Sequence, residues 1–173
     1  MKRDKLVLLA VLGLAACNKS SQSRTDTHTK TGFAELDCER DAGAATSANG
    51  EREAVASAVR LYFQGHATGD GNYHRQAFHP EARLFWVKSG ALSQKTSAEF
   101  AAGATGKPAA DEARRERRIA AIDVAGDAAM AKVELTYPDV HFVDYLSLLK
   151  IDGRWTIVNK IFHREDVGPS AMR

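Results

Sequence analysis

The stretch that decides the fold is residues 144–163, DYLSLLKIDGRWTIVNKIFH. Runs rich in leucine, β-branched and aromatic residues flank Asp152-Gly153, and this dipeptide readily takes the positive φ angles of a type I′ turn. The stretch therefore predicts a long β-hairpin.

The turn also determines which side chains share a face of the hairpin. A two-residue loop pairs Ile151 with Arg154, and it places Asp144 opposite Ile161 and diagonal to Asn159 and His163. The shared face then consists of Phe142, Asp144, Leu146 and Leu148 on the first strand and Trp155, Ile157, Asn159, Ile161 and His163 on the second. This arrangement suggests that Asp144 orients His163 as a general base. Alternatively, Asp144 and Asn159 satisfy buried backbone or helix-cap donors.

A second register is compatible with the same residues. A three-residue loop with Gly153 as a bulge pairs Asp144 with Lys160 as a cross-strand ion pair, and His163 then faces His141. The sequence leaves both registers open.

Residues 1–17 are typical of an export signal. Lys2, Arg3 and Lys5 precede an apolar run from Leu6 to Leu14, which is too short to span a bilayer because spanning takes about 20 residues. Leu14-Ala15-Ala16-Cys17 resembles the lipobox of bacterial lipoproteins, which implies acylation of Cys17 and a lipid anchor; the alternative is an ordinary secretory signal with an incidental cysteine. Asn18, rather than aspartate, follows the cysteine. We therefore expect a periplasm-facing location in the bacterial cell envelope, with the outer membrane favoured.

Residues 18–50 are rich in Ser, Thr, Ala, Gly and charge, which predicts a disordered tether. Cys38 lies within it and has no partner once Cys17 carries lipid, so an internal disulfide is not expected. The chain has 24 basic and 22 acidic residues, and loss of residues 1–16 leaves 21 of each. A neutral chain gives no reason to expect nucleic-acid binding.

One folded domain is predicted over residues 51–166, with a tail at 167–173. Helices are expected at 51–65, after Asp70 and after the capping box Thr96-Ser97-Ala98-Glu99. Strands are expected at 82–87, 91–95, 118–124 and 128–137, before the C-terminal hairpin. This order predicts an α+β fold in which the helices pack on one face of a curved antiparallel sheet.

A resemblance to a known family rests on several short motifs taken in order. These are Tyr62-Phe63-Gln64-Gly65, Gly69-Asp70, residues 77–82 (AFHPEA), residues 123–129 (DVAGDAA) and the hairpin from Asp144 to His163. Together they resemble the nuclear-transport-factor-2-like (NTF2-like) superfamily, in its lumazine-binding or SnoaL-like branch. The resemblance implies a cystatin-like cone of sheet, closed by about three N-terminal helices around a pocket.

The same resemblance bears on chemistry. Ketosteroid isomerases of this fold carry a base near the position of Trp86, which cannot accept a proton, so that reaction is not expected. Tyr62 lies roughly where those enzymes place a tyrosine that donates to an oxyanion, although a core tyrosine with a satisfied hydroxyl is the plainer interpretation.

The sequence thus supports three hypotheses about function. The first is non-catalytic binding of a small apolar or aromatic ligand in a pocket lined by Tyr62, Phe63, Phe78, His79, Trp86, Leu146, Ile157, Asn159 and His163. The second is an isomerase, dehydratase or hydrolase that uses Asp144 and His163. The third is a homodimer formed through an apolar outer sheet face of Tyr145, Leu149, Val158 and Phe162.

Neither a metal nor a cofactor is expected. The six histidines form no metal-binding pattern, because His74 and His79 are five residues apart and the following Pro80 forces His79 out of the helix. Gly69-Asp70-Gly71 does not follow a strand, so it is not expected to bind phosphate.

Overall fold

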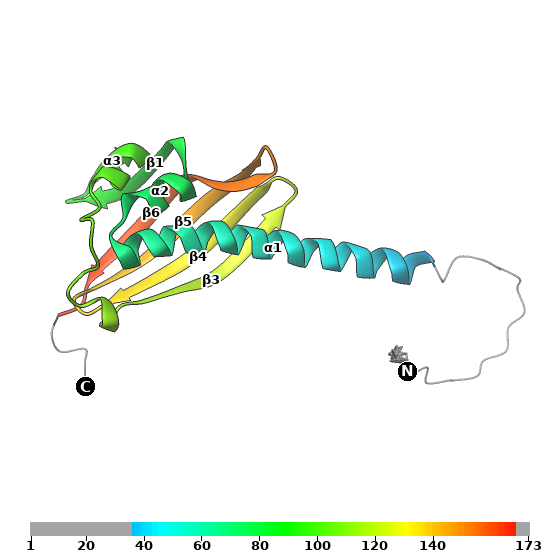
Figure 1. The fold of residues 1–173 in the computed structure, drawn as a ribbon, viewed down its shortest axis with the longest axis horizontal. Helices are drawn as coiled ribbons and strands as arrows, with labels where there is room; N and C mark the ends of the chain where they lie inside the picture. Colours follow the sequence, from blue (N-terminus) through cyan, green and yellow to red (C-terminus); the bar gives the residue numbers. More distant parts are fainter. Residues whose placement is uncertain (1–35, 169–173) are drawn as a thin grey trace, which may run out of the picture.

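The computed structural model describes residues 36–168. Within these residues, three α-helices and six strands follow one another in the order shown in Figure 1. The elements are α1 (Leu36–Thr68), α2 (Gly71–Ala77), β1 (Phe78–Lys88), β2 (Ala91–Thr96), α3 (Ser97–Ala102), a 3-10 turn η1 (Glu112–Arg114), β3 (Glu116–Ala125), β4 (Ala128–Tyr137), β5 (Val140–Ile151) and β6 (Arg154–Asp166). Cys17 and the rest of the predicted signal lie outside the described residues.

The first helix is longer than predicted. It begins at Leu36 rather than Glu51, so residues 36–50, predicted to belong to a disordered tether, are helical. Alanine and charged residues predominate there, and a helix that already packs on a domain extends at little cost through such residues. Figure 1 shows this N-terminal part of α1 projecting past the sheet, while the C-terminal part crosses the sheet face.

The short helices begin at the predicted caps. Asp70 caps α2, and its side chain accepts a hydrogen bond from Asn72 N at 2.8 Å. Thr96 and Glu99 form a reciprocal capping box at the start of α3, with Glu99 N donating to Thr96 Oγ1 at 3.1 Å and Thr96 N to Glu99 Oε2 at 2.7 Å. Gly71 lets the two helices approach, because a Cβ at this position would overlap the carbonyl oxygen of Ala101.

The six strands form one sheet in the order β2-β1-β6-β5-β4-β3. Strands β3 to β6 make the predicted antiparallel meander, and β1 joins β6 in parallel. The helix α1 packs on β3, β4 and β6, and the core lies between α1 and the sheet. The α+β fold with helices on one face of a curved sheet is therefore confirmed.

The C-terminal hairpin contains the predicted turn and an unpredicted bulge. Ile151 pairs with Arg154, and Asp152 and Gly153 have φ angles of 49° and 77°, as a type I′ turn requires. Farther from the turn, Leu148 pairs with Ile157 but Ser147 pairs with Asn159, so Val158 is the extra residue of a β-bulge. Each predicted register is therefore wrong over the outer half of the hairpin.

The bulge exchanges the two faces of β6 beyond Val158. Lys160 and Phe162 turn toward the helices, whereas His163 is exposed on the opposite face. Asp144 lies opposite Phe162 instead of Ile161. The expected cluster of Asp144 with Asn159 and His163 is therefore wrong. Phe162 also leaves the outer face, where an apolar dimer surface was expected to include it.

No helix within residues 36–168 is long and apolar enough to cross a membrane.

Candidate functional site

Three polar side chains from three elements meet in the core. The Tyr62 hydroxyl on α1 donates to Asp144 Oδ2 on β5 at 2.5 Å. Lys160 Nζ on β6 donates to the Tyr62 hydroxyl oxygen at 2.7 Å and to Asp144 Oδ2 at 2.9 Å. Tyr62 and Asp144 are 0% exposed and Lys160 is 5% exposed. We call these three residues the buried triad.

Burying two charges is tolerated because they compensate each other. An isolated carboxylate or ammonium in a protein interior costs several kcal/mol, and pairing with good hydrogen-bond geometry offsets most of that cost. The Lys160 ammonium also lies 5.0 Å from the ring centre of Tyr62, 5.4 Å from that of Phe100 and 4.6 Å from that of Phe162. These aromatic faces favour a cation at this point.

Burial shifts the pKa values of Tyr62 and Lys160. Burial raises the pKa of Tyr62 well above 10.0, and the neighbouring Asp144 carboxylate raises it further. Burial also lowers the pKa of Lys160 from 10.5, although Asp144 opposes this effect. At neutral pH the Tyr62 phenol is therefore a neutral hydrogen-bond donor.

The triad has unused hydrogen-bonding capacity. An ammonium has three N–H donors, and the hydrogen bonds of Lys160 within residues 36–168 use two of them. Asp144 Oδ1 is buried and accepts no hydrogen bond from any described residue. An unsatisfied buried polar atom is costly, so this site favours an added polar partner.

The triad borders an inner cavity of about 150 Å³. Tyr62 and Lys160 contribute polar atoms to a wall that is otherwise largely apolar. The lining residues are Tyr62, His66, Leu84, Lys95, Phe100, Leu135, Phe142, Lys160 and Phe162. This cavity resembles ligand sites in which a few polar groups orient a mainly apolar molecule.

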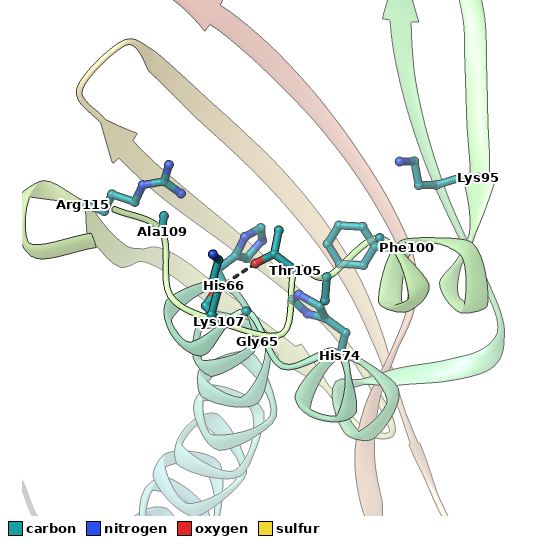
Figure 2. A pocket seen from close by; sticks show the side chains of 12 residues that line it. Gly65, His66, His74, Lys95, Phe100, Thr105, Lys107, Ala109 and Arg115 are labelled. Atoms are coloured by element: carbon teal, nitrogen blue, oxygen red, sulfur yellow. Dashed lines mark hydrogen bonds between the residues drawn. The ribbon is translucent and has the colours of Figure 1, made fainter. Parts of the chain in front are cut away.

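A second, outer cavity of about 360 Å³ lies beside the inner one. His66, Lys95 and Phe100 line both cavities, so the two share a wall. Figure 2 shows Lys95 and Arg115 on opposite sides of the outer cavity, with His66, His74 and Phe100 between them. The outer cavity is thus a basic vestibule beside a more apolar chamber.

Two histidines stand between the vestibule and the triad. The rings of His66 and His74 are 5.1 Å apart at their centres. Burial, together with the nearby charge of Lys160, lowers the pKa of His66 well below 6.5 and that of His74 to about 4. Gly65 provides the space for His74, because a Cβ at Gly65 would overlap the imidazole ring. Both imidazoles are therefore neutral at pH 7.

The residues predicted to line a pocket are divided among three environments. Tyr62 lines the inner cavity. Four others belong to or pack on the core, namely Phe63, Phe78, Leu146 and Ile157. His79 is half-buried, with its Nδ1 accepting a hydrogen bond from Glu81 N at 3.2 Å.

The remaining predicted residues lie on either side of the sheet. Trp86 stacks on Phe162 with a centroid distance of 5.4 Å, at the edge of the inner face. Asn159 and His163 are on the outer face, where His163 borders a surface groove with Tyr145 and Ile161.

Sequence reasoning identified two members of the triad but not their role together. Lys160 entered only as an ion-pair partner of Asp144 in the second register, and that ion pair does form, at 2.9 Å. The available signal was a lysine within an apolar strand, between Ile157 and Phe162. His66 and Phe100 gave no such signal, since their places depend on how α1 and α3 meet the sheet.

No three His, Cys, Asp or Glu side chains in the described part of the chain gather closely enough to hold a metal ion.

The chain matches one family model over residues 50–163, and that family is described as "Putative lumazine-binding". The chain belongs to this family. Solved NTF2-like proteins of unknown function have the same fold. One from Shewanella baltica OS155 has a TM-score of 0.60 and 28% identity, covering 66% of this chain and 94% of its own. One from Silicibacter pomeroyi DSS-3 has a TM-score of 0.60 and 25% identity, covering 68% of this chain and 98% of its own.

A third structure and one characterised relative extend the comparison. An NTF2-like protein of unknown function from Methylobacillus flagellatus KT has a TM-score of 0.57 and 29% identity, covering 65% of this chain and 90% of its own. The aldolase FrzH of Cladobotryum sp. is 24% identical over 113 residues, which are 65% of this chain and 90% of that protein. The family accordingly points to a small-ligand site within an NTF2-like fold.

Proposed function

We propose that this protein binds a small, mainly apolar or aromatic molecule in the inner cavity, with an acceptor oxygen of the molecule directed at Lys160. The observation that carries the proposal is the ammonium of Lys160, which borders an apolar cavity with one N–H donor unused by the described residues. An acceptor oxygen at this point would complete the hydrogen bonds of the ammonium.

The cavity supports a ligand smaller than a drug molecule. Its volume of about 150 Å³ is below the roughly 300–1,000 Å³ of typical ligand pockets. The rings of Phe100, Phe142 and Phe162 line it, and such rings favour a flat aromatic ligand. The ligand would approach through the vestibule, past Lys95 and His66.

Benzyl alcohol is a suitable probe because it combines one aromatic ring with one oxygen. We expect saturable binding, detected by shifts of protein NMR resonances from the cavity lining. A Leu135→Phe substitution fills the cavity and should abolish these shifts, whereas Leu149→Phe, at an exposed leucine, should not. Equal binding by both variants would place the ligand elsewhere and reject the proposal.

A second candidate function is aldol cleavage or formation. It is favoured by the similarity to the aldolase FrzH and by the buried Asp144 carboxylate, whose Oδ1 accepts no hydrogen bond from a described residue. Asp144 would accept the proton of a β-hydroxyl group while Tyr62 and Lys160 stabilise the developing negative charge. This assignment replaces the pairing of Asp144 with His163, which lie on opposite faces of the sheet.

The enzyme hypothesis predicts turnover of a simple substrate. The aldol adduct of benzaldehyde and acetone should release benzaldehyde, followed by its ultraviolet absorbance. The Asp144→Asn variant should lose this activity while His163→Ala retains it. Absence of turnover across a panel of such adducts would leave binding as the function.

We also propose that the protein is lipid-anchored through Cys17 and faces the periplasm, with the outer membrane favoured. The support is the run Leu14-Ala15-Ala16-Cys17 after a short apolar segment, followed by Asn18. Labelled palmitate should be incorporated into the protein in bacterial cells, and Cys17→Ala should prevent it. Incorporation into the variant would contradict the proposed site.

A homodimer through the outer sheet face is proposed in a revised form. A groove of about 320 Å³ lies there, with Tyr145 39%, Ile161 50% and Leu92 74% exposed. Exposed apolar surface of this kind favours a second copy of the chain. Ile161→Asp should shift the mass measured by light scattering to that of a monomer, and Ile151→Asp, outside the groove, should not.

A further inference from the structure

We propose that Lys160 forms a covalent imine with an aldehyde or ketone held in the inner cavity, so that the ligands of this protein are small carbonyl compounds. The inference rests on the proposed binding function and deepens it. The geometry that supports it is a lysine amine placed in the wall of an apolar cavity, beside a carboxylate and a phenol.

The cavity would hold a carbonyl carbon against Lys160 Nζ. The lysine is almost entirely buried and its ammonium packs against the rings of Tyr62, Phe100 and Phe162. A carbonyl compound in the cavity would lie among these rings. Apolar surroundings also exclude water, which otherwise hydrolyses imines.

A proton must leave Lys160 before the amine can attack, and Asp144 is placed to accept it. Asp144 Oδ2 lies 2.9 Å from Nζ, within range of direct proton transfer. Burial lowers the pKa of Lys160, so the neutral amine is more accessible here than at the protein surface. A neutral pair of amine and carboxylic acid also avoids two charges in a site of low dielectric.

The step balances without an added reagent. The neutral amine nitrogen bonds to the carbonyl carbon, and the positively charged nitrogen of this adduct then gives a proton to the carbonyl oxygen, which becomes a hydroxyl group. The C–O bond then breaks, and Asp144 returns its proton so that the oxygen leaves as water. Overall, one ammonium and one carbonyl group give one iminium and one water molecule. The Asp144 carboxylate then pairs with the iminium as it paired with the ammonium.

The test is reductive trapping of the whole protein with benzaldehyde and sodium cyanoborohydride at neutral pH. Reduction fixes an iminium as a benzylated lysine, which trypsin does not cleave. Modification at Lys160 therefore joins the peptides on either side into one that spans residues 155–164. We expect Lys160 to be modified several-fold faster than the exposed Lys88, because the inner cavity holds the aldehyde beside its amine and burial lowers its pKa.

Three controls separate this inference from its alternatives. Lys95 lines both cavities, so its rate of benzylation shows whether access to the cavity alone is sufficient for fast trapping of a lysine. An excess of benzyl alcohol, which has the same ring but no carbonyl, should slow labelling of Lys160 and not of Lys88. In Lys160→Met trypsin cannot cleave at position 160, so residues 155–164 always form one peptide; this peptide should carry no benzyl group, and labelling of Lys88 should be unchanged.

The outcomes distinguish the covalent step from binding itself. If benzyl alcohol binds but Lys160 reacts no faster than Lys88, the imine is overturned and the binding proposal stands. If Lys160 is unreactive and benzyl alcohol does not bind either, both are overturned. Preferential trapping at Lys160 with protection by benzyl alcohol supports both.

Discussion

Substituting the two charged members of the buried triad, singly and together, tests whether they act as one unit. Asp144→Asn removes the carboxylate charge and leaves the Lys160 ammonium buried without a counter-ion. Lys160→Met removes the cation and leaves the Asp144 carboxylate with the Tyr62 hydroxyl as its remaining donor within residues 36–168. The double variant carries no charge at either position.

The expected loss of stability follows from the burial of both Asp144 and Lys160. Asp144 is 0% exposed and Lys160 5% exposed, and breaking a buried ion pair by removing one partner costs about 3–5 kcal/mol. Replacing both partners with neutral groups is often close to neutral. The double variant should therefore be no less stable than either single variant, which corresponds to a coupling energy of at least about 3 kcal/mol.

Equilibrium urea unfolding of the four proteins at pH 7 measures this coupling. The matched control is the exposed pair Arg60 and Glu53, joined at 2.7 Å with side chains 53% and 66% exposed. Its coupling energy should be far smaller, because solvent and salt screen an exposed ion pair. If the free-energy changes of the two single variants instead add to that of the double variant within about 0.5 kcal/mol, Lys160 and Asp144 do not compensate each other's charge.

Two further predictions concern the packing around the cavities. Burial lowers the pKa of His74 from 6.5 to about 4. The stability that the neutral imidazole contributes is therefore fully present above pH 6.5 and is lost as the pH falls toward 4. Between about pH 7.5 and pH 5, the free energy of unfolding should fall by about 2 kcal/mol because of this residue. His74→Phe should flatten that part of the urea-unfolding profile, and an unchanged slope would contradict the buried neutral imidazole. Gly71→Ala should lower stability by about 1–3 kcal/mol, because the new Cβ overlaps Ala101 O. Gly103→Ala should cost much less, because the nearest non-neighbouring atom to its new Cβ is 3.4 Å away. Equal shifts of the melting temperature in the two variants would contradict the close approach of α2 and α3.

Much of the fold could be predicted because it depends on local chemistry. Asp152-Gly153 readily takes the positive φ angles of a type I′ turn, and Asp70 and Thr96 offer side-chain oxygens to helix starts. The structure confirms both the turn and the two caps. The length of α1 could not be predicted in the same way. Its residues before Glu51 have no apolar face to signal a helix.

The candidate site could be predicted only in part, for a physical reason. Asp144 stood out as a carboxylate on an apolar face, and Tyr62 as a polar-tipped aromatic at the end of a helix. The alternation of apolar and polar residues does not indicate the bulge at Val158, because both faces of β6 carry apolar residues there. One extra residue exchanges His163 for Lys160 on the inner face, so the partner of Asp144 changed from an imidazole to an ammonium.

A crystal structure of the protein grown with a saturating concentration of benzyl alcohol would show directly whether the inner cavity binds a ligand through Lys160. We expect the aromatic ring between Phe100 and Phe142, with the alcohol oxygen accepting a hydrogen bond from Lys160 Nζ. Density for the probe only in the outer groove beside Tyr145 and Ile161, with ordered water alone against Lys160, would contradict it.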